Sequence, residues 1–108
     1  MNGQEATCTT KTTAEDWCPA CEEKARLVAV LMEPQRIRIL RLLRSGDRCV
    51  CEIERSLDIS QNLVSHHLKV LREAGLVTAS KEGQFVHYAR VERRIQELIH
   101  ALEELVAQ

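Results

Sequence analysis

Five cysteines are the residues of this 108-residue chain whose type and spacing could do chemistry. Cys49 and Cys51 flank a single valine in the stretch RCVCE, and Cys18 and Cys21 enclose a Pro-Ala pair in WCPAC. Residues two apart on a helix point to different sides, so one buried helical face cannot hold both Cys49 and Cys51. Thiolates at these short spacings are typical of sites that bind soft metal ions. Cys8 lies apart from both pairs and is a spare cysteine.

The composition of the chain excludes several classes of protein. The N-terminal segment has no apolar core for a signal peptide, and no apolar run approaches the roughly 20 residues of a membrane span. We therefore expect a cytoplasmic protein with reduced cysteines and no membrane partner. The net charge is −1, yet basic blocks at residues 34–48 and 60–94 lie between acidic ends. Local basic patches, rather than net charge, make the electrostatic footprint of a nucleic-acid-binding protein.

The elements that position these residues are mostly helical, and the length predicts one folded domain. Residues 1–20 are mostly polar and predict a flexible, cysteine-bearing extension, while residues 21–108 form the folded domain. A first helix is expected over residues 22–32. Pro34 then favours the start of a second helix, which Ser45–Gly46 ends.

A helix–turn–helix is predicted in the middle of the chain. A short helix over residues 50–57 is followed by a tight turn at Asp58–Ile59, and Ser60 is a good N-cap for a second helix that runs through Ala74. The alternating stretch after Gly75 predicts two strands joined by a turn at Glu82–Gly83. Three apolar residues of the second helix share one face and are expected in the core: Val64, Leu68 and Leu71.

The last helix completes a mostly α fold with a small β-hairpin, which is a winged helix–turn–helix. Pro19, near the other end of the chain, suits the second position of a tight turn between Cys18 and Cys21. Apolar residues step by four and three along one face of the last helix and predict a dimerisation seam, and hence a homodimer: Val91, Ile95, Leu98, Leu102 and Leu105.

The second helix of the helix–turn–helix carries polar side chains suited to base edges and phosphates. We expect it to enter the major groove of double-stranded DNA, with the hairpin touching the backbone or the minor groove. His66 and His67 are adjacent and point in different directions on a helix, which makes a metal site at that pair unfavourable. The predicted DNA-binding residues are Gln61, Asn62, Ser65, His66, His67, Lys69, Lys81 and Gln84.

The stretch ISQNLVSHHLKVLREAGLVTASKEGQFVHYA closely resembles the ArsR/SmtB family of metal-responsive bacterial repressors. The resemblance covers about residues 24–106. It implies a homodimeric repressor that binds an operator and leaves it when a metal or metalloid binds. The CVC motif at Cys49 and Cys51 looks like the thiolate sensing site of this family. Both sulfurs can reach one ion only where the chain is not yet regular helix.

The resemblance leaves several inducers open. Arsenic-sensing relatives often carry a third cysteine where this chain has Glu54, whereas cadmium- and lead-sensing relatives use cysteines of an N-terminal extension. Cys18, Cys21, Cys49 and Cys51 would together suit Cd(II), Zn(II) or Pb(II), and three of them would serve As(III). In relatives the extension reaches the partner subunit, so the site could be shared across the dimer.

Other functions fit the sequence less well. The CPAC stretch is similar to thioredoxin motifs, but the strand and βαβ frame of that fold are missing. Redox sensing by the same cysteines on the same DNA-binding fold is the second candidate. No nucleophile–base constellation predicts an enzyme. On the last helix, His100 and Glu103 have ligand-like spacing, but a solvated face is the better interpretation.

Overall fold

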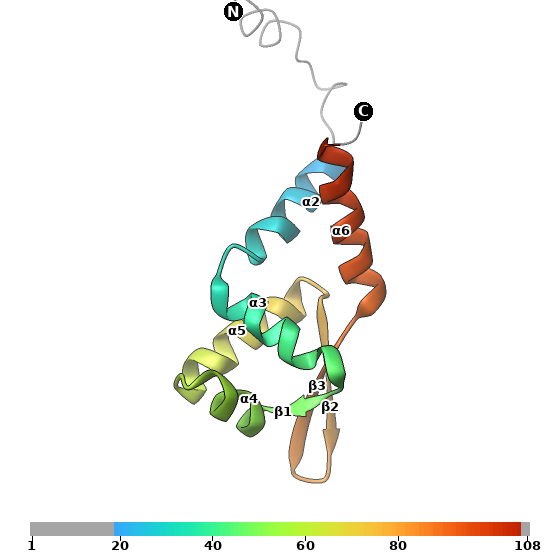
Figure 1. The fold of residues 1–108 in the computed structure, drawn as a ribbon. Coiled ribbons are helices and arrows are strands. Elements are labelled where there is room, and N and C mark those ends of the chain that lie inside the picture. The colour runs from blue at the N-terminus through green and yellow to red at the C-terminus, as the bar shows by residue number, and fades with distance from the viewer. Residues whose placement is uncertain (1–18, 107–108) are drawn as a thin grey trace, which may run out of the picture.

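The computed structural model describes residues 19–106. Five helices, a short 3-10 turn and a small sheet follow one another along this part of the chain, shown in Figure 1. Among the described helices, none is long and apolar enough to cross a membrane. In chain order the elements are α2 (Pro19–Val30), α3 (Pro34–Leu42), η2 (Leu43–Ser45), β1 (Arg48–Cys49), α4 (Val50–Leu57), α5 (Gln61–Glu73), β2 (Val77–Glu82), β3 (Phe85–Arg90) and α6 (Glu92–Val106).

The molecule has two parts, which Figure 1 separates clearly. Helices α2 and α6 lie side by side at one end, and α3, α4 and α5 pack together with the sheet at the other. The N-terminal end of α2 lies beside the C-terminal end of α6. The predicted winged helix–turn–helix is confirmed: α4 and α5 are its two helices, and β2 with β3 is the hairpin that we call the wing.

The core forms where the inner faces of these helices meet. The inner face of α5 is fully buried at Val64, Leu68 and Leu71, as the spacing of these residues predicts. Ile39 of α3 and Ile53 of α4 are equally buried against it. These five side chains hold the orientation of α5 relative to the rest of the chain, because burying each aliphatic side chain contributes about 1.5–3 kcal/mol.

The sheet has three strands in the order β1–β3–β2, all antiparallel, rather than the two predicted. The wing turn is displaced by one residue from the prediction, because Glu82 pairs with Phe85 and leaves Gly83 and Gln84 as the loop. Gly83 has a φ of 64°, a conformation that glycine adopts without steric cost. The added strand β1 places Cys49 opposite His87 of β3.

The start of the folded region differs from the sequence prediction. Helix α2 begins at Pro19 and ends at Val30, so Pro19 does not lie in a tight turn and Cys21 belongs to the first helical turn. The physical reason is that proline is well suited to the first position of a helix, where its missing N–H has no partner to lose. At the other predicted boundaries, Pro34 opens α3 and Asp58, in the left-handed conformation, ends α4.

Part of the predicted dimerisation seam on α6 is buried within its own chain. Ile95 and Leu98 are buried in the core of their own chain, Leu98 with 2% of its surface exposed. These two residues of the row are therefore covered by their own chain, whereas Leu102 of the same row is exposed. Among the described side chains of α6, the large exposed apolar ones are Ile99 and Leu102, at 42% and 39%. Val91 is half-buried, and the side chain of Leu105 lies outside the described residues.

Candidate nucleic-acid interface and thiol site

The turn between α4 and α5 fixes where the exposed face of α5 points. Asp58 donates its backbone N–H to Glu54 O at 2.9 Å and closes α4. Ser60 then caps α5, because its Oγ accepts a hydrogen bond from the backbone N–H of Leu63 at 3.2 Å. The predicted N-cap is confirmed. Five predicted DNA-binding residues of this helix are exposed: Gln61, Asn62, Ser65, His66 and Lys69.

The prediction that His67 is exposed is wrong, because only 7% of its surface is accessible. Its Nδ1 accepts a hydrogen bond from Arg36 Nε at 3.3 Å. Burial, together with the positive charge of Arg36, lowers the pKa of His67 below its ordinary value. His67 follows Val64 by three residues and precedes Leu71 by four, so it belongs to the inner face of α5 despite its polar side chain.

Leu63 is an exposed residue that sequence reasoning did not include in the interface. It lies in the first turn of α5, about half exposed, between the polar residues of the outer face. Its apolar side chain suits contact with a thymine methyl group. The signal was available, because Leu63 lies off the i, i+4, i+7 row that fills the core.

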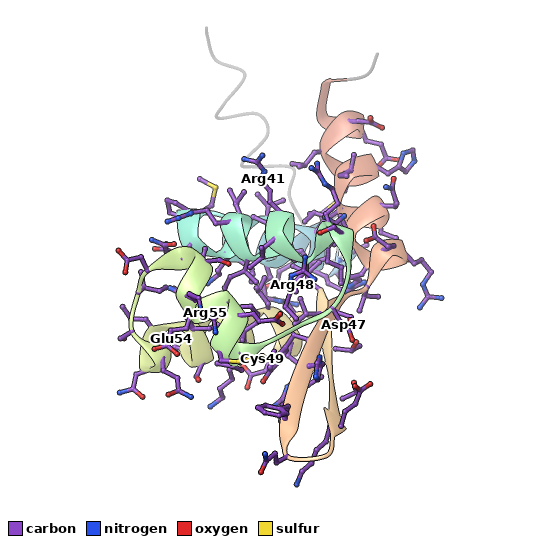
Figure 2. All side chains as sticks on the ribbon, turned by 60° about the horizontal axis from the view of Figure 1, so that its bottom comes forward. Arg41, Asp47, Arg48, Cys49, Glu54 and Arg55 are labelled. Carbon is purple, nitrogen blue, oxygen red and sulfur yellow. A yellow bond between two sulfur atoms is a disulfide. The ribbon has the colours of Figure 1, made fainter. Side chains whose placement is uncertain are left out.

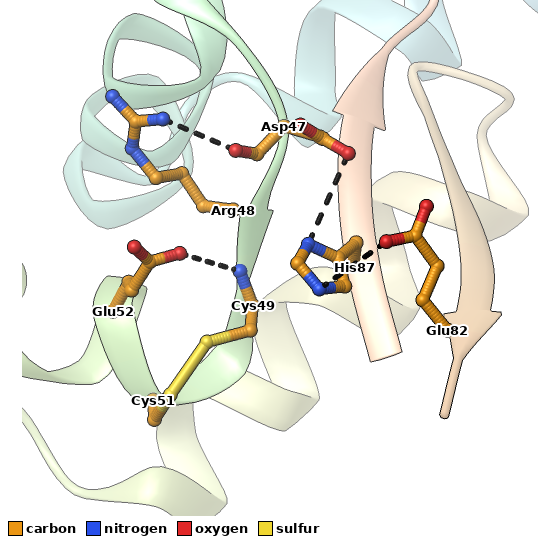
Figure 3. Close-up of polar contacts among 7 residues, drawn as sticks. All are labelled: Asp47, Arg48, Cys49, Cys51, Glu52, Glu82 and His87. Atoms are coloured by element: carbon orange, nitrogen blue, oxygen red, sulfur yellow. Dashed lines mark hydrogen bonds and ion pairs between the residues drawn. A yellow bond between two sulfur atoms is a disulfide. The ribbon is translucent and has the colours of Figure 1, made fainter. Parts of the chain in front are cut away.

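The wing presents both of its predicted DNA-binding residues to solvent. Lys81 is exposed on β2, and Gln84 is exposed in the turn. On β3, His87 lies between two carboxylates, with Nδ1 3.9 Å from Asp47 Oδ2 and Nε2 3.8 Å from Glu82 Oε1 (Figure 3). Asp47 comes just before β1, so this cluster joins the root of α4 to the wing.

The two central cysteines meet at the start of α4. Cys49 ends β1 with extended backbone (φ −83°, ψ 164°) and donates its N–H to Glu52 Oε1 at 3.0 Å. Cys51 lies in the first turn of α4, and the structure joins the two by a disulfide with Cα atoms 5.4 Å apart (Figure 3). Cys49 is 8% exposed, whereas Cys51 is open to solvent. The two sulfurs thus lie together where the chain passes from extended backbone into the first turn of α4.

Figure 2 shows Cys49 at the junction between α4 and the wing, directly after Asp47 and Arg48. In the same view, Arg48 and Arg55 lie closer to Cys49 than does Arg41, which belongs to α3. Glu54 is half-buried on α4 and lines a hollow together with Cys51. Cys51 therefore borders a hollow lined mostly by charged and polar side chains, whereas Cys49 is nearly buried.

Of the other three cysteines, Cys21 lies within residues 19–106, and it does not join this pair in its own chain. Cys21 is exposed in the first turn of α2, at the end of the molecule opposite β1 and α4 (Figure 1). Cys18 and Cys8 lie outside the described residues. Among residues 19–106, no three or more His, Cys, Asp or Glu side chains are arranged to hold a metal ion. Cys49 and Cys51 supply two sulfur donors, so an ion held there needs donors from beyond this arrangement.

The histidine of the last helix has ordinary neighbours. His100 lies 3.9 Å from Glu103 and 3.4 Å from Glu104, and all three side chains are more than half exposed. This arrangement matches the solvated face expected there.

A helix–turn–helix with a polar outer face on its second helix, followed by a wing, defines a winged helix–turn–helix DNA-binding protein. Residues 33–79 match the family described as "Bacterial regulatory protein, arsR family". The chain is 40% identical over 85 residues to an uncharacterized HTH-type transcriptional regulator of Methanocaldococcus jannaschii, which covers 78% of this chain and 96% of the relative. The chain belongs to the ArsR family, whose members are transcriptional regulators and not enzymes.

Two further comparisons concern arsenical resistance. The arsenical resistance operon repressor of Escherichia coli is 42% identical over 64 residues, 58% of this chain and 55% of the repressor. A crystal structure of a possible transcriptional regulator for arsenical resistance is 34% identical, with a TM-score of 0.69, over 74% of this chain and 83% of that one.

Proposed function

We propose that this protein is a homodimeric repressor that leaves its operator when a thiophilic metal ion binds Cys49 and Cys51. One observation carries the proposal: the two sulfurs lie together at the first residues of α4, the helix that packs against α5. A bound ion would supply a positive charge and tetrahedral or trigonal bonds to thiolates. Cd(II), Pb(II) and Zn(II) are the favoured inducers, and As(III) is the alternative.

The position of Cys49 explains how binding at the thiols could reach the DNA-binding surface. Cys49 belongs at once to β1, which pairs with the wing, and to the N-cap of α4, which supports α5. A ligand set that turns Cys49 toward Cys51 in a new geometry must change one of these two contacts. Release then requires tighter metal binding in the DNA-free arrangement, by about 1.4 kcal/mol for each tenfold loss of operator affinity.

We assign the remaining donors, Cys18 and Cys21, to the partner subunit. The support is the placement of Cys21, which lies at the far end of α2 from the Cys49–Cys51 pair of its own chain. A cysteine pair of one subunit and the CVC pair of the other would give four thiolates for Cd(II), Zn(II) or Pb(II).

The homodimer in this proposal forms through α2 and α6. These helices border an apolar groove of about 370 Å³, and the residues around it are Cys21, Lys24, Ala25, Val28, Ala101, Leu102 and Glu104. Ile99 adds exposed apolar surface on α6. On DNA, the α5 helices of the two subunits would read half-sites about 10–10.5 base pairs apart, or a multiple of that. The wing residues Lys81 and Gln84 would contact the backbone or minor groove.

Operator release titrated with Cd(II), Pb(II), Zn(II) and As(III) in a reducing buffer tests the metal proposal. Cys49→Ser and Cys51→Ser should keep operator affinity near wild type and lose release, because neither side chain belongs to the exposed face of α5. Cys8→Ser is the matched control and should respond as wild type. Release of Cys49→Ser at wild-type metal concentrations would refute the site.

Mixed dimers test whether the site is shared. One chain carries Cys18→Ser and Cys21→Ser, and the other carries Cys49→Ser and Cys51→Ser. A shared site leaves one complete set of four thiolates in this heterodimer, whereas a site within one chain leaves none. Cd–thiolate absorption in the heterodimer, at about half the wild-type intensity, is the expected result.

The disulfide between Cys49 and Cys51 favours redox sensing as a second candidate function. An external disulfide or a peroxide would take two electrons from the two thiols and leave the bond seen in the structure. Release of the operator by such an oxidant in metal-free buffer, reversed by dithiothreitol, would establish this function. Release by metal alone would exclude it as the main signal.

A further inference from the structure

Arg36, in the first turn of α3, joins two other helices through its side chain. Its Nη1 donates to the backbone carbonyl of Val30 at 3.1 Å, and its Nε donates to Nδ1 of His67 at 3.3 Å. Val30 is the last residue of α2, and His67 lies in the middle of α5. One half-buried guanidinium therefore connects the helix that packs on α6 with the helix that carries the DNA-binding face.

The bond to Val30 has a clear role at the end of α2. The last carbonyls of a helix have no partner within the helix and carry partial negative charge, so a cation there is favourable. Arg36 fills this role from the next helix rather than from α2, whose last turn has no basic residue. The contact fixes the angle at which the chain passes from α2 into α3.

The bond to His67 determines the protonation state of that residue. An arginine side chain only donates hydrogen bonds, so Nδ1 of His67 must accept and cannot carry a proton. A protonated imidazole would lose this bond and face the Arg36 guanidinium as a second cation. The other charged or titratable groups that face His67 are Glu33, before α3, and His66 on its own helix.

Those neighbours favour the neutral form. Burial and the charge of Arg36 lower the pKa of His67, His66 lowers it further, and only Glu33 raises it. The geometry and the electrostatics agree, because both require an unprotonated ring inside the fold.

We propose that Arg36 is a positioning residue, which holds the DNA-binding face of α5 in register with α2 through neutral His67, so that protonation of His67 weakens operator binding. Ser65 and His66 directly precede His67 on the same turn of α5, and both are exposed. A change in the position of the His67 side chain would therefore rotate or loosen Ser65 and His66, which are predicted to contact base edges. The inference rests on DNA recognition by α5 and is independent of the inducer.

Two substitutions at one position separate this role from simple packing. In His67→Asn, the amide oxygen lies near the position of Nδ1 and accepts from Arg36 without titrating. In His67→Leu, the side chain fills the space but accepts nothing. At about pH 8, His67→Asn should bind a specific operator within about threefold of wild type, and His67→Leu about tenfold more weakly, with non-specific binding unchanged in both. Arg36→Met also loses the bond to Val30, so it should bind at least as weakly as His67→Leu, and the double variant should be no weaker than Arg36→Met alone.

The pH profile is the reading that a merely structural role would not move. Between about pH 8 and pH 5, wild-type operator affinity should fall by about threefold or more relative to His67→Asn, because a histidine with a lowered pKa takes up its proton only toward the acid end of this range. The remaining histidines are common to both proteins, so their effects cancel in this ratio. A constant ratio across this range, or additive losses in the Arg36→Met, His67→Leu double variant, would overturn the inference. Failure of wild type to bind any operator would instead refute DNA recognition by α5.

Discussion

The exposed apolar pair on α6 gives the sharpest prediction about assembly. Ile99 and Leu102 lie on one side of α6 at 42% and 39% exposure, whereas Leu98 is buried in its own chain. We expect the double variant Ile99→Ala, Leu102→Ala to fold as wild type and to dimerise much more weakly. The same logic predicts that Leu98→Ala weakens the fold, by about 2–4 kcal/mol, rather than the dimer alone.

The magnitude follows from the surface that remains to be covered. Burying a whole Leu or Ile side chain contributes about 2 kcal/mol, so covering the exposed two-fifths contributes about 0.8 kcal/mol. A symmetric dimer covers four such side chains, or about 3 kcal/mol in all. Alanine keeps its β-carbon, so the expected loss is about 2–3 kcal/mol, which is a roughly 30- to 150-fold weaker dimer.

Sedimentation equilibrium over a dilution series measures this change directly, and thermal unfolding confirms that each variant is folded. His100→Ala on the same helix removes an exposed side chain of a different face and should dimerise as wild type. The assignment of this surface would be refuted if the dimer dissociation constant of the double variant stayed within threefold of wild type. A tenfold change corresponds to about 1.4 kcal/mol, so a threefold change is well below the expected loss.

Three further predictions concern the thiol site, the wing and His67. Glu52→Ala removes the acceptor of the Cys49 N–H bond and should lower the free energy of unfolding by about 1 kcal/mol and weaken metal binding, both measurable by titration. Gly83→Ala should cost about 1 kcal/mol in thermal unfolding, because the φ of 64° strains an alanine while the added methyl meets no atom within 4 Å. The lowered pKa of His67 means that the unfolded chain takes up this proton at higher pH than the folded chain does. Stability should therefore fall as pH drops through about 6.5 and below, and His67→Asn should lose less, as followed by urea unfolding.

The local parts of the fold could be predicted from the sequence because their signals are local. The side-chain oxygen of Ser60 predicts a helix N-terminus, and the spacing of Val64, Leu68 and Leu71 predicts a buried face. The prediction failed at His67, which was assigned to the DNA-binding face because its side chain is polar. Its position in the helix belongs instead to the buried row of Val64, Leu68 and Leu71. The compensating donor, Arg36, is 31 residues away in sequence and leaves no local trace.

Non-local pairing explains the other failures. Strand β1 is two residues long, so it exists only because β3 lies beside it, and no propensity of Arg48 or Cys49 predicts it. The apolar row on α6 was predicted as a dimerisation seam, but Ile95 and Leu98 are buried in their own chain, which only the packing of α6 against its own core could show. The cysteines predict thiolate chemistry with soft metal ions. Their spacing along the chain could not show that Cys21, in α2, and Cys49, in β1, lie at opposite ends of the molecule.

The shortness of strand β1 also sets a rate. A strand held by two residue pairs is a small cooperative unit, so we expect it to open more often than the helices around it. Cys51 is open to a thiol reagent at all times, whereas nearly buried Cys49 is reached only during such openings. In the reduced protein, alkylation should therefore proceed in two phases, fast at Cys51 and slow at Cys49. The rate of the slow phase measures how often β1 separates from the wing. Bound DNA that restrains the wing should lower this rate further.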